Sequence, residues 1–299
     1  MLRLALIIFF ILCSLSQTVR AEEIALVIGD DSAPYKEFAN TLRQSLRGSK
    51  WRIRYTDETL RPLDQEPVDL VITAGSDTFR RTLGNTGKSP LLATLLPANA
   101  YYSILAQKPS SPSISAIYLD QPANRQARLI RLLLPASQRI GVLAGDQSMS
   151  QANSFRSVFT TQRLHIITES ADNDEQVLPK LESLLPRIDA LLALPDPLIY
   201  SRNSVKPLLI TAYRFRRPVI AFSAALVKAG ALAALYSSPA QIGRQTGEMI
   251  VARGNRLPPP TGPAEFSLSI NHSVANTFGL RLPEEAELFQ KLLAGGPEQ

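Results

Sequence analysis

The chain has 299 residues, 45% of them apolar, and 32 lysines and arginines against 26 aspartates and glutamates, for a formal net charge of +6. This length and composition allow two medium-sized domains, each able to bury its own core. The basic residues are scattered apart from Arg52-Ile-Arg54 and Arg214-Phe-Arg-Arg217. The second cluster falls where a helix is expected to end and where cations complement the helix dipole. We therefore expect no nucleic-acid partner.

The first 21 residues have the layout of a secretory signal peptide: Arg3, an apolar run over 4–12, and Val19-Arg20-Ala21 as a cleavage site. The run is far shorter than the about 20 apolar residues of a membrane span. Cys13, the one cysteine, does not follow the small residue that a lipoprotein signal needs. We expect an exported, non-lipidated, periplasmic chain that begins near Glu22 and has no disulfide. A retained membrane anchor is the alternative.

Short apolar runs alternate with helical patterns along the rest of the chain. Such runs are typical of strands that are covered on both faces. The spacing of Tyr35, Phe38, Leu42 and Leu46 indicates a helix of about 12 residues after the first run. In the first half we expect strands over 23–29, 51–55, 69–73, 90–96 and 114–119, and a further helix over 78–83.

The same pattern restarts after the polar segment 120–122. We expect helices over 123–134, 150–161, 175–185 and 201–215, and strands over 139–144, 164–168, 190–194 and 219–222. A small-residue turn, an apolar run over 230–235 and a helix opened by Ser238-Pro239 follow. Repeated strand–helix units imply parallel sheets with right-handed crossovers, so the fold class is α/β, and the restart indicates two lobes.

Four segments carry a resemblance to a known family. They are VDLVITAGS at 68–76, LIRLLLPASQRIGVL at 129–143, the stretch 218–249, and EFSLSINHSVANTFGLRLP at 265–283. Their order and spacing resemble ABC transporter substrate-binding proteins of the type I periplasmic-binding fold, in the branch whose characterised members bind tryptophan and tyrosine. The resemblance covers nearly the whole mature chain. It implies two Rossmann-like lobes that are joined by a hinge and close around a small molecule.

On this resemblance, the first lobe spans 22–118 plus 239–258, and the second spans 119–238 plus 259–299. Ligands of open parallel sheets bind beyond the carboxyl ends of the strands, so we nominate binding residues there. The N–H groups at Ser76-Asp77 and Gln147-Ser148 would suit a ligand carboxylate, and Asp196 an ammonium group. The full set is Asp31, Ser32, Tyr35, Gly75, Ser76, Asp77, Asp146, Gln147, Ser148, Asp196, Ser223 and Tyr236.

Simpler roles compete with these assignments. Helix capping alone would explain five of the residues, and Tyr35 lies on an apolar helical stripe that favours the core. The chain also departs from the family around the predicted cleft. The connection 56–67 is short, two acids follow the first strand, the fourth-strand loop reads LLPAN, and 103–113 lacks the usual glycine and asparagine. An aromatic amino acid is therefore not carried over as the ligand.

Motifs of catalysis are not found. The mature chain has two histidines, His165 in an apolar strand and His272 near the C-terminus, and it contains no Gly-x-Ser-x-Gly elbow. The glycines of Gly84-Asn-Thr-Gly-Lys-Ser89 are too close for a phosphate-binding loop, and no His, Cys and acid cluster has metal-ligand spacing. We expect no enzyme, no cofactor and no metal.

The sequence therefore predicts a monomeric periplasmic solute-binding protein that delivers its ligand to an ABC permease. One alternative is a sensor component that presents the ligand to a membrane receptor or signalling enzyme. Another is a periplasmic hydrolase on the same scaffold. A chain that has lost ligand binding and keeps the fold for a structural partnership is also left open.

Overall fold

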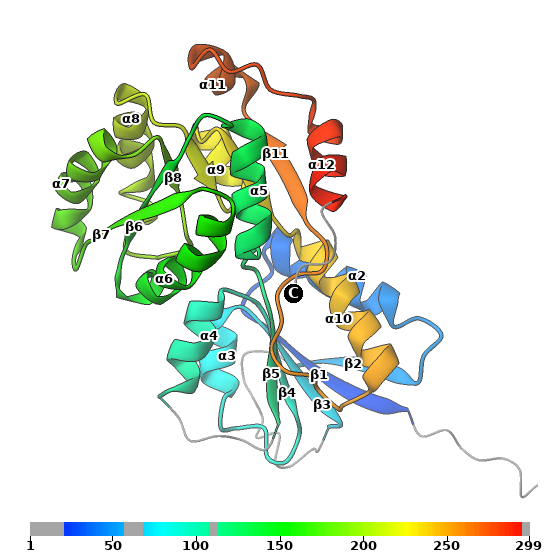
Figure 1. Ribbon diagram of the computed structural model, residues 1–299. Helices are drawn as coiled ribbons and strands as arrows, with labels where there is room; N and C mark the ends of the chain where they lie inside the picture. The colour runs from blue at the N-terminus through cyan, green and yellow to red at the C-terminus, as the bar shows by residue number, and fades with distance from the viewer. Residues whose placement is uncertain (1–20, 57–67, 108–112, 295–299) are drawn as a thin grey trace, which may run out of the picture.

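The computed structural model describes residues 21–56, 68–107 and 113–294 (Figure 1). The predicted signal peptide and nearly all of the connection 56–67 lie outside these residues. Two sheets organise the described chain, with strand orders β2-β1-β3-β4-β5 and β11-β10-β9-β8-β6-β7. Each has helices packed against it, so the α/β fold with two lobes is confirmed.

The first sheet is parallel throughout. Its strands are β1 (Glu22–Ile28), β2 (Trp51–Thr56), β3 (Leu70–Ala74), β4 (Leu91–Leu96) and β5 (Ile114–Tyr118). Successive side chains of a strand point to opposite faces. Ile24 and Leu26 accordingly join one core cluster, which includes Phe38 of α2 (Ala33–Ser45). Ala25 and Val27 join another, which includes residues of α3 (Ser76–Thr82) and α4 (Ala98–Leu105).

The second sheet contains β6 (Arg139–Ala144), β7 (His165–Ser170), β8 (Ala190–Leu192), β9 (Val219–Ala221), β10 (Ala233–Tyr236) and β11 (Ser267–Ile270). One strand departs from the parallel sheets that we predicted, because β11 is an antiparallel edge strand against β10. The accompanying helices are α5 (Ala123–Leu133), α6 (Asp146–Thr161), α7 (Asp174–Leu184), α8 (Val205–Arg214), α9 (Ala224–Ala229), α11 (His272–Thr277) and α12 (Glu285–Leu293), and a 3-10 helix, η1 (Leu185–Arg187), follows α7.

Helix α10 (Pro239–Arg253) leaves the second sheet and packs against α2 of the first. The helix opens at Ser238-Pro239, as the sequence predicts, and Ser238 begins it with a complete capping box. The two helices touch through backbone. A β-carbon on Gly243 would lie 2.7 Å from the Phe38 carbonyl oxygen, and one on Gly247 would lie 2.4 Å from Ser45 Cβ. Glycine is therefore needed where α10 crosses α2.

The chain passes between the sheets three times, and these passages form the hinge. The first lies just after β5, and the second lies between β10 and α10. The third lies between α10 and β11, and in it Thr261 pairs with β5 of the first sheet. Its N–H donates to the Ala116 carbonyl at 3.0 Å, and its carbonyl accepts from the Tyr118 N–H at 2.9 Å.

Helices α4, α9 and α12 and the 3-10 helix η1 are additions to the predicted elements. Helix α4 starts within the LLPAN segment, which we interpreted as a loop, α9 replaces the small-residue turn, and α12 follows the segment 265–283. Four other helices start at a different residue from the one expected: α3 at Ser76 instead of 78, α6 at Asp146 instead of 150, α7 at Asp174 instead of 175, and α8 at Val205 instead of 201. Within the described residues, no helix is both long and apolar enough to cross a membrane.

Candidate functional site

A cavity of about 280 Å³ lies where the chain passes between the sheets. Its walls come from the carboxyl ends of β4, β8, β9 and β10, from the first passage, and from α5 and α6. The described residues that line it are Pro97, Leu119, Asp120, Gln121, Gln126, Gln151, Phe155, Ala193, Leu194, Pro195, Phe222, Ser223, Leu235, Tyr236 and Ser237. This is the edge at which parallel sheets bind ligands.

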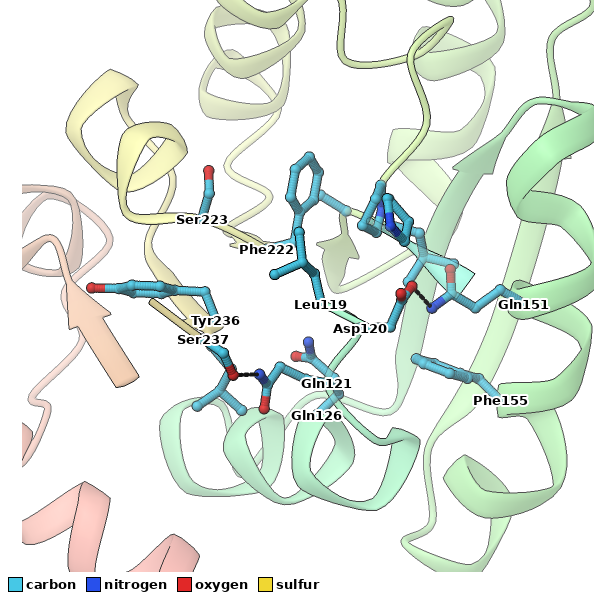
Figure 2. A pocket seen from close by; sticks show the side chains of 15 residues that line it. Leu119, Asp120, Gln121, Gln126, Gln151, Phe155, Phe222, Ser223, Tyr236 and Ser237 are labelled. Atoms are coloured by element: carbon cyan, nitrogen blue, oxygen red, sulfur yellow. Dashed lines mark hydrogen bonds between the residues drawn. The ribbon is translucent and has the colours of Figure 1, made fainter. Parts of the chain in front are cut away.

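Apolar side chains form much of the wall. Leu119, Phe155 and Phe222 surround the space beside Asp120 (Figure 2). The Phe222 ring is held edge-on against Tyr200, with the ring centroids 5.5 Å apart. The cavity is near the lower end of the about 300–1,000 Å³ range of small-molecule sites. It therefore suits a compact ligand with an apolar body.

Asp120 is the polar centre of the cavity. Its Oδ2 accepts a hydrogen bond from the Ala98 N–H of α4 at 2.6 Å, and its Oδ1 accepts one from Gln151 Nε2 of α6 at 2.8 Å. Burial raises the pKa of this carboxyl above its usual value, against the lowering effect of these two hydrogen bonds. Asp120 thereby connects a helix of the first lobe to a helix of the second.

Two amide oxygens of residues that line the cavity are buried without a hydrogen-bond partner, Gln126 Oε1 and Gln151 Oε1. The orientation of the Gln151 amide is fixed, because its nitrogen donates to Asp120. Gln126 is 4% exposed and comes from α5. A buried acceptor without a partner costs about 1–3 kcal/mol, so both oxygens favour a hydrogen-bond donor in the cavity.

Hydrogen bonds join the three passages next to the cavity. Gln121 Nε2 of the first passage donates to Ser237 Oγ of the second at 2.9 Å. Ser237 Oγ in turn donates to the Glu265 carbonyl oxygen of the third at 2.6 Å. Arg125 fixes the other end of Gln121 by donating to its Oε1 at 2.6 Å. The first of these bonds is drawn in Figure 2.

A second, more polar groove of about 470 Å³ runs between α4 and α6. Asp146 and Gln147, two of the predicted binding residues, line it together with Asn99 and Tyr102. Gln151 lines both the groove and the cavity. Ser223 and Tyr236 are the predicted residues that line the cavity, and in Figure 2 their side chains point away from Asp120.

Asp196 has a complete set of partners within the protein. It is 4% exposed. Its Oδ2 accepts from the Gly145 N–H at 3.0 Å and from Ser148 Oγ at 2.6 Å, and its Oδ1 accepts from the Leu198 N–H at 2.9 Å. These bonds explain why Asp196 and Ser148 are present without any ligand. Ligand contact through either residue stays a prediction.

The predicted residues of the first lobe gather at β1 and β3, outside both spaces. Gly75 has a φ of +101°, and a β-carbon there would lie 2.6 Å from Tyr35 Oη, so the tyrosine covers this turn. Burial, together with the charges of Asp30 and Asp77, raises the pKa of Tyr35. The others begin helices: Ser32 precedes α2, beside exposed Asp31, and Ser76 and Asp77 open α3. Their contact with ligand is untested.

The sequence-based nominations missed five polar residues of the cavity, Asp120, Gln121, Gln126, Gln151 and Ser237. We searched strand-end loops, whereas these residues belong to passages between the sheets and to helices α5 and α6. The one available signal was the polar segment 120–122 at the restart of the strand–helix pattern, which we interpreted only as a boundary.

Comparisons with known proteins agree with this architecture. A family model described as ABC transporter substrate binding protein matches residues 56–288. No curated protein matches the sequence significantly. Among the described residues, no group of three or more His, Cys, Asp or Glu side chains could hold a metal ion.

Three solved structures illustrate the similarity. One is a conserved domain protein from Vibrio cholerae, with 17% identity, a TM-score of 0.62, and coverage of 90% of this chain and 98% of that one. The second is an ABC domain in complex with L-Trp from Streptococcus pneumoniae, with 18% identity, a TM-score of 0.61, and coverage of 90% of this chain and 97% of that one. The third is a ligand-free, open substrate-binding protein with adhesive properties from Clostridium difficile, with 17% identity, a TM-score of 0.68, and coverage of 88% of this chain and 96% of that one. At these identities the similarity shows the fold alone.

Proposed function

The chain belongs to the ABC transporter substrate-binding protein family, and we propose that it closes two lobes on a small molecule and delivers that molecule to an ABC permease. The observation that carries this proposal is the cavity at the passages between the sheets. It is concave and largely apolar, and it contains a few convergent polar groups, which are the general properties of small-molecule sites.

The moving bodies in this proposal are the two lobes. We assign 22–118 plus 239–258 to the first lobe and 119–238 plus 259–299 to the second. The pairing of Thr261 with β5 favours a boundary a few residues later for the last segment. Contacts between the lobes support closure. Asn99 Nδ2 of α4 donates to the Pro195 carbonyl oxygen at 3.0 Å, and the Asp120–Gln151 bond lies next to it.

The cellular setting follows from the same proposal. The signal-peptide pattern in residues 1–21, which lie almost wholly outside the described part of the chain, supports export to the periplasm. There the chain acts as a monomer without a cofactor, and the closed form is the one that the permease recognises. A sensor component that uses the same closure differs only in its membrane partner.

A thermal-shift screen of residues 22–299 against amino acids, sugars, nucleosides and polyamines tests the proposal. A solute present at about 100 times its dissociation constant stabilises the folded state by about 2.7 kcal/mol, which raises the melting temperature by several degrees. We expect one chemical class to produce this shift. A folded protein that shows no shift with any class would contradict solute binding.

A further inference from the structure

The chemistry of the cavity indicates which solutes it can take. The acceptors beside the apolar wall are the Asp120 carboxylate and the unpaired oxygens of Gln126 and Gln151. Among the described residues that line the cavity, none is a lysine, arginine or histidine. The polar end of the cavity therefore presents acceptors and negative charge, and it favours a donor with positive charge.

A carboxylate on the ligand has no favourable place beside Asp120. Helix N-termini are the usual backbone sites for anions, but carboxylates of the chain already lie at the first turns of α4 and α6, the two helices that Asp120 connects. Asp120 accepts from the first N–H of α4, and Asp196 accepts from Gly145 and Ser148 at the start of α6. A ligand carboxylate beside Asp120 would lie near this negative charge, and no lysine, arginine or histidine is among the described residues that line the cavity to balance it.

The volume of the cavity and its apolar wall determine the size and chemistry of the ligand's apolar body. A cavity of about 150 Å³ lined by apolar side chains holds benzene. The cavity here measures about 280 Å³, so it has room for one ring and a short chain. Phe155, Phe222 and Leu119 line the space beside Asp120 that such a ring would fill (Figure 2).

We propose that the cavity binds a small primary amine with an apolar body about the size of one ring and no carboxylate, its ammonium group directed at an acceptor of the cavity, Asp120 or the unpaired oxygen of Gln126 or Gln151. This inference rests on the proposed solute-binding function and narrows it. It also departs from an amino acid ligand, because the carboxylate that every free amino acid carries would be left unpaired.

Three compounds with the same ring and chain test the inference: 2-phenylethylamine, L-phenylalanine and 3-phenylpropionate, each titrated calorimetrically into residues 22–299. We expect 2-phenylethylamine to bind at least about tenfold more tightly than the other two, because burying an unpaired charge costs more than the about 1.4 kcal/mol of a tenfold change. Equal or tighter binding of either carboxylate would overturn the inference and leave solute binding intact.

Two further outcomes separate the inference from the proposed function. If the three compounds fail to bind while a sugar or nucleoside of the wider screen binds, the amine inference is wrong and the solute-binding function stands. If the folded protein binds nothing in the whole screen, both are wrong.

Variants locate the ammonium group. Gln126→Met keeps the shape of the side chain and removes the unpaired oxygen, so we expect about tenfold weaker binding of 2-phenylethylamine. The melting temperature of the free protein should not fall. Gln290→Met, on exposed α12, is the matched control and should change neither value. Asp120→Asn should also weaken binding about tenfold or more, because it removes the charge and keeps an acceptor. Unchanged affinity in both Gln126→Met and Asp120→Asn would overturn the inference.

Discussion

Asp120 and Asp196 stand on neighbouring loops, and their hydrogen bonds indicate different roles. Asp196 accepts bonds from Gly145, Ser148 and Leu198, all within the second lobe. Asp120 joins α4 of one lobe to α6 of the other and lines the cavity. The Asp196 carboxylate therefore stabilises one lobe, whereas the Asp120 carboxylate can respond to a ligand and to the position of the lobes.

Replacing Asp196 should therefore lower stability directly. Asp196→Ala removes the acceptor of several buried donors, and each unsatisfied donor costs about 1–3 kcal/mol. We expect the free energy of unfolding to fall by about 3 kcal/mol in urea titrations of the ligand-free protein. Asp172→Ala, on an exposed loop, is the control. Unchanged stability with weakened ligand binding would show instead that Asp196 is a binding residue.

Asp120 should make stability depend on pH. Burial raises its pKa in the folded state above the value of about 4 in the unfolded chain. Between these two pKa values the folded state holds the proton more tightly, so the free energy of unfolding falls as the pH rises through that window. Urea titrations from about pH 4 upward should show this loss in the wild type and not in Asp120→Asn. Equal slopes in the two proteins would contradict it.

At the scale of elements, the contact of α10 with α2 fixes a late segment of the chain to the first lobe. Gly243 and Gly247 allow the two backbones to approach closely. The capping box at Ser238 starts α10 as the chain leaves β10. The second passage between the sheets is therefore anchored at both of its ends.

Gly247→Ala tests this anchoring. Alanine favours an isolated helix by about 1 kcal/mol, but its β-carbon would lie 2.4 Å from Ser45 Cβ, so α10 must move. Overpacking of this kind costs about 1–3 kcal/mol, and we expect a net loss of stability in thermal unfolding. Glu248→Ala, exposed on the same helix, should be neutral. A more stable Gly247→Ala protein would show that the helices are not in close contact.

The elements that the sequence predicts well are those with strong patterns. The runs at β1 and β3 are buried, as continuous apolar strands should be. Two of the missed elements, α4 and α9, have weak patterns. Helix α9 has six residues, three of them alanine, and α4 follows a proline, so both look like turns. Helix α6 starts earlier than expected because Asp146, Gln147 and Ser148 are as typical of loops as of a first helical turn.

The same reasoning explains the incomplete prediction of the site. Phe222 and Leu194 follow strands, so the sheet rule places them at the cavity. Gln126 and Gln151 lie within helices of the second lobe, and Asp120 bonds both Gln151 and, in the other lobe, the Ala98 N–H. Contacts between lobes leave no periodic pattern in a sequence. They became visible only in three dimensions.

At the scale of the whole molecule, the three passages form one connected hinge. Gln121, Ser237 and Glu265 join them through hydrogen bonds, and the cavity lies against this connection. A ligand that contacts Asp120 on the hinge and Phe222 beyond β9 therefore touches the parts that must move together. A bound ligand stabilises the closed form, relative to the open form, by the difference between its binding free energies for the two forms.

The most direct measurement is a crystal structure of residues 22–299 grown with the solute that raises the melting temperature most. Ligand density should occupy the cavity between Leu119, Phe155 and Phe222, with a donor group within about 3 Å of Asp120, Gln126 or Gln151. Ligand density elsewhere on the molecule, with this cavity empty, would contradict a solute-binding site between the lobes.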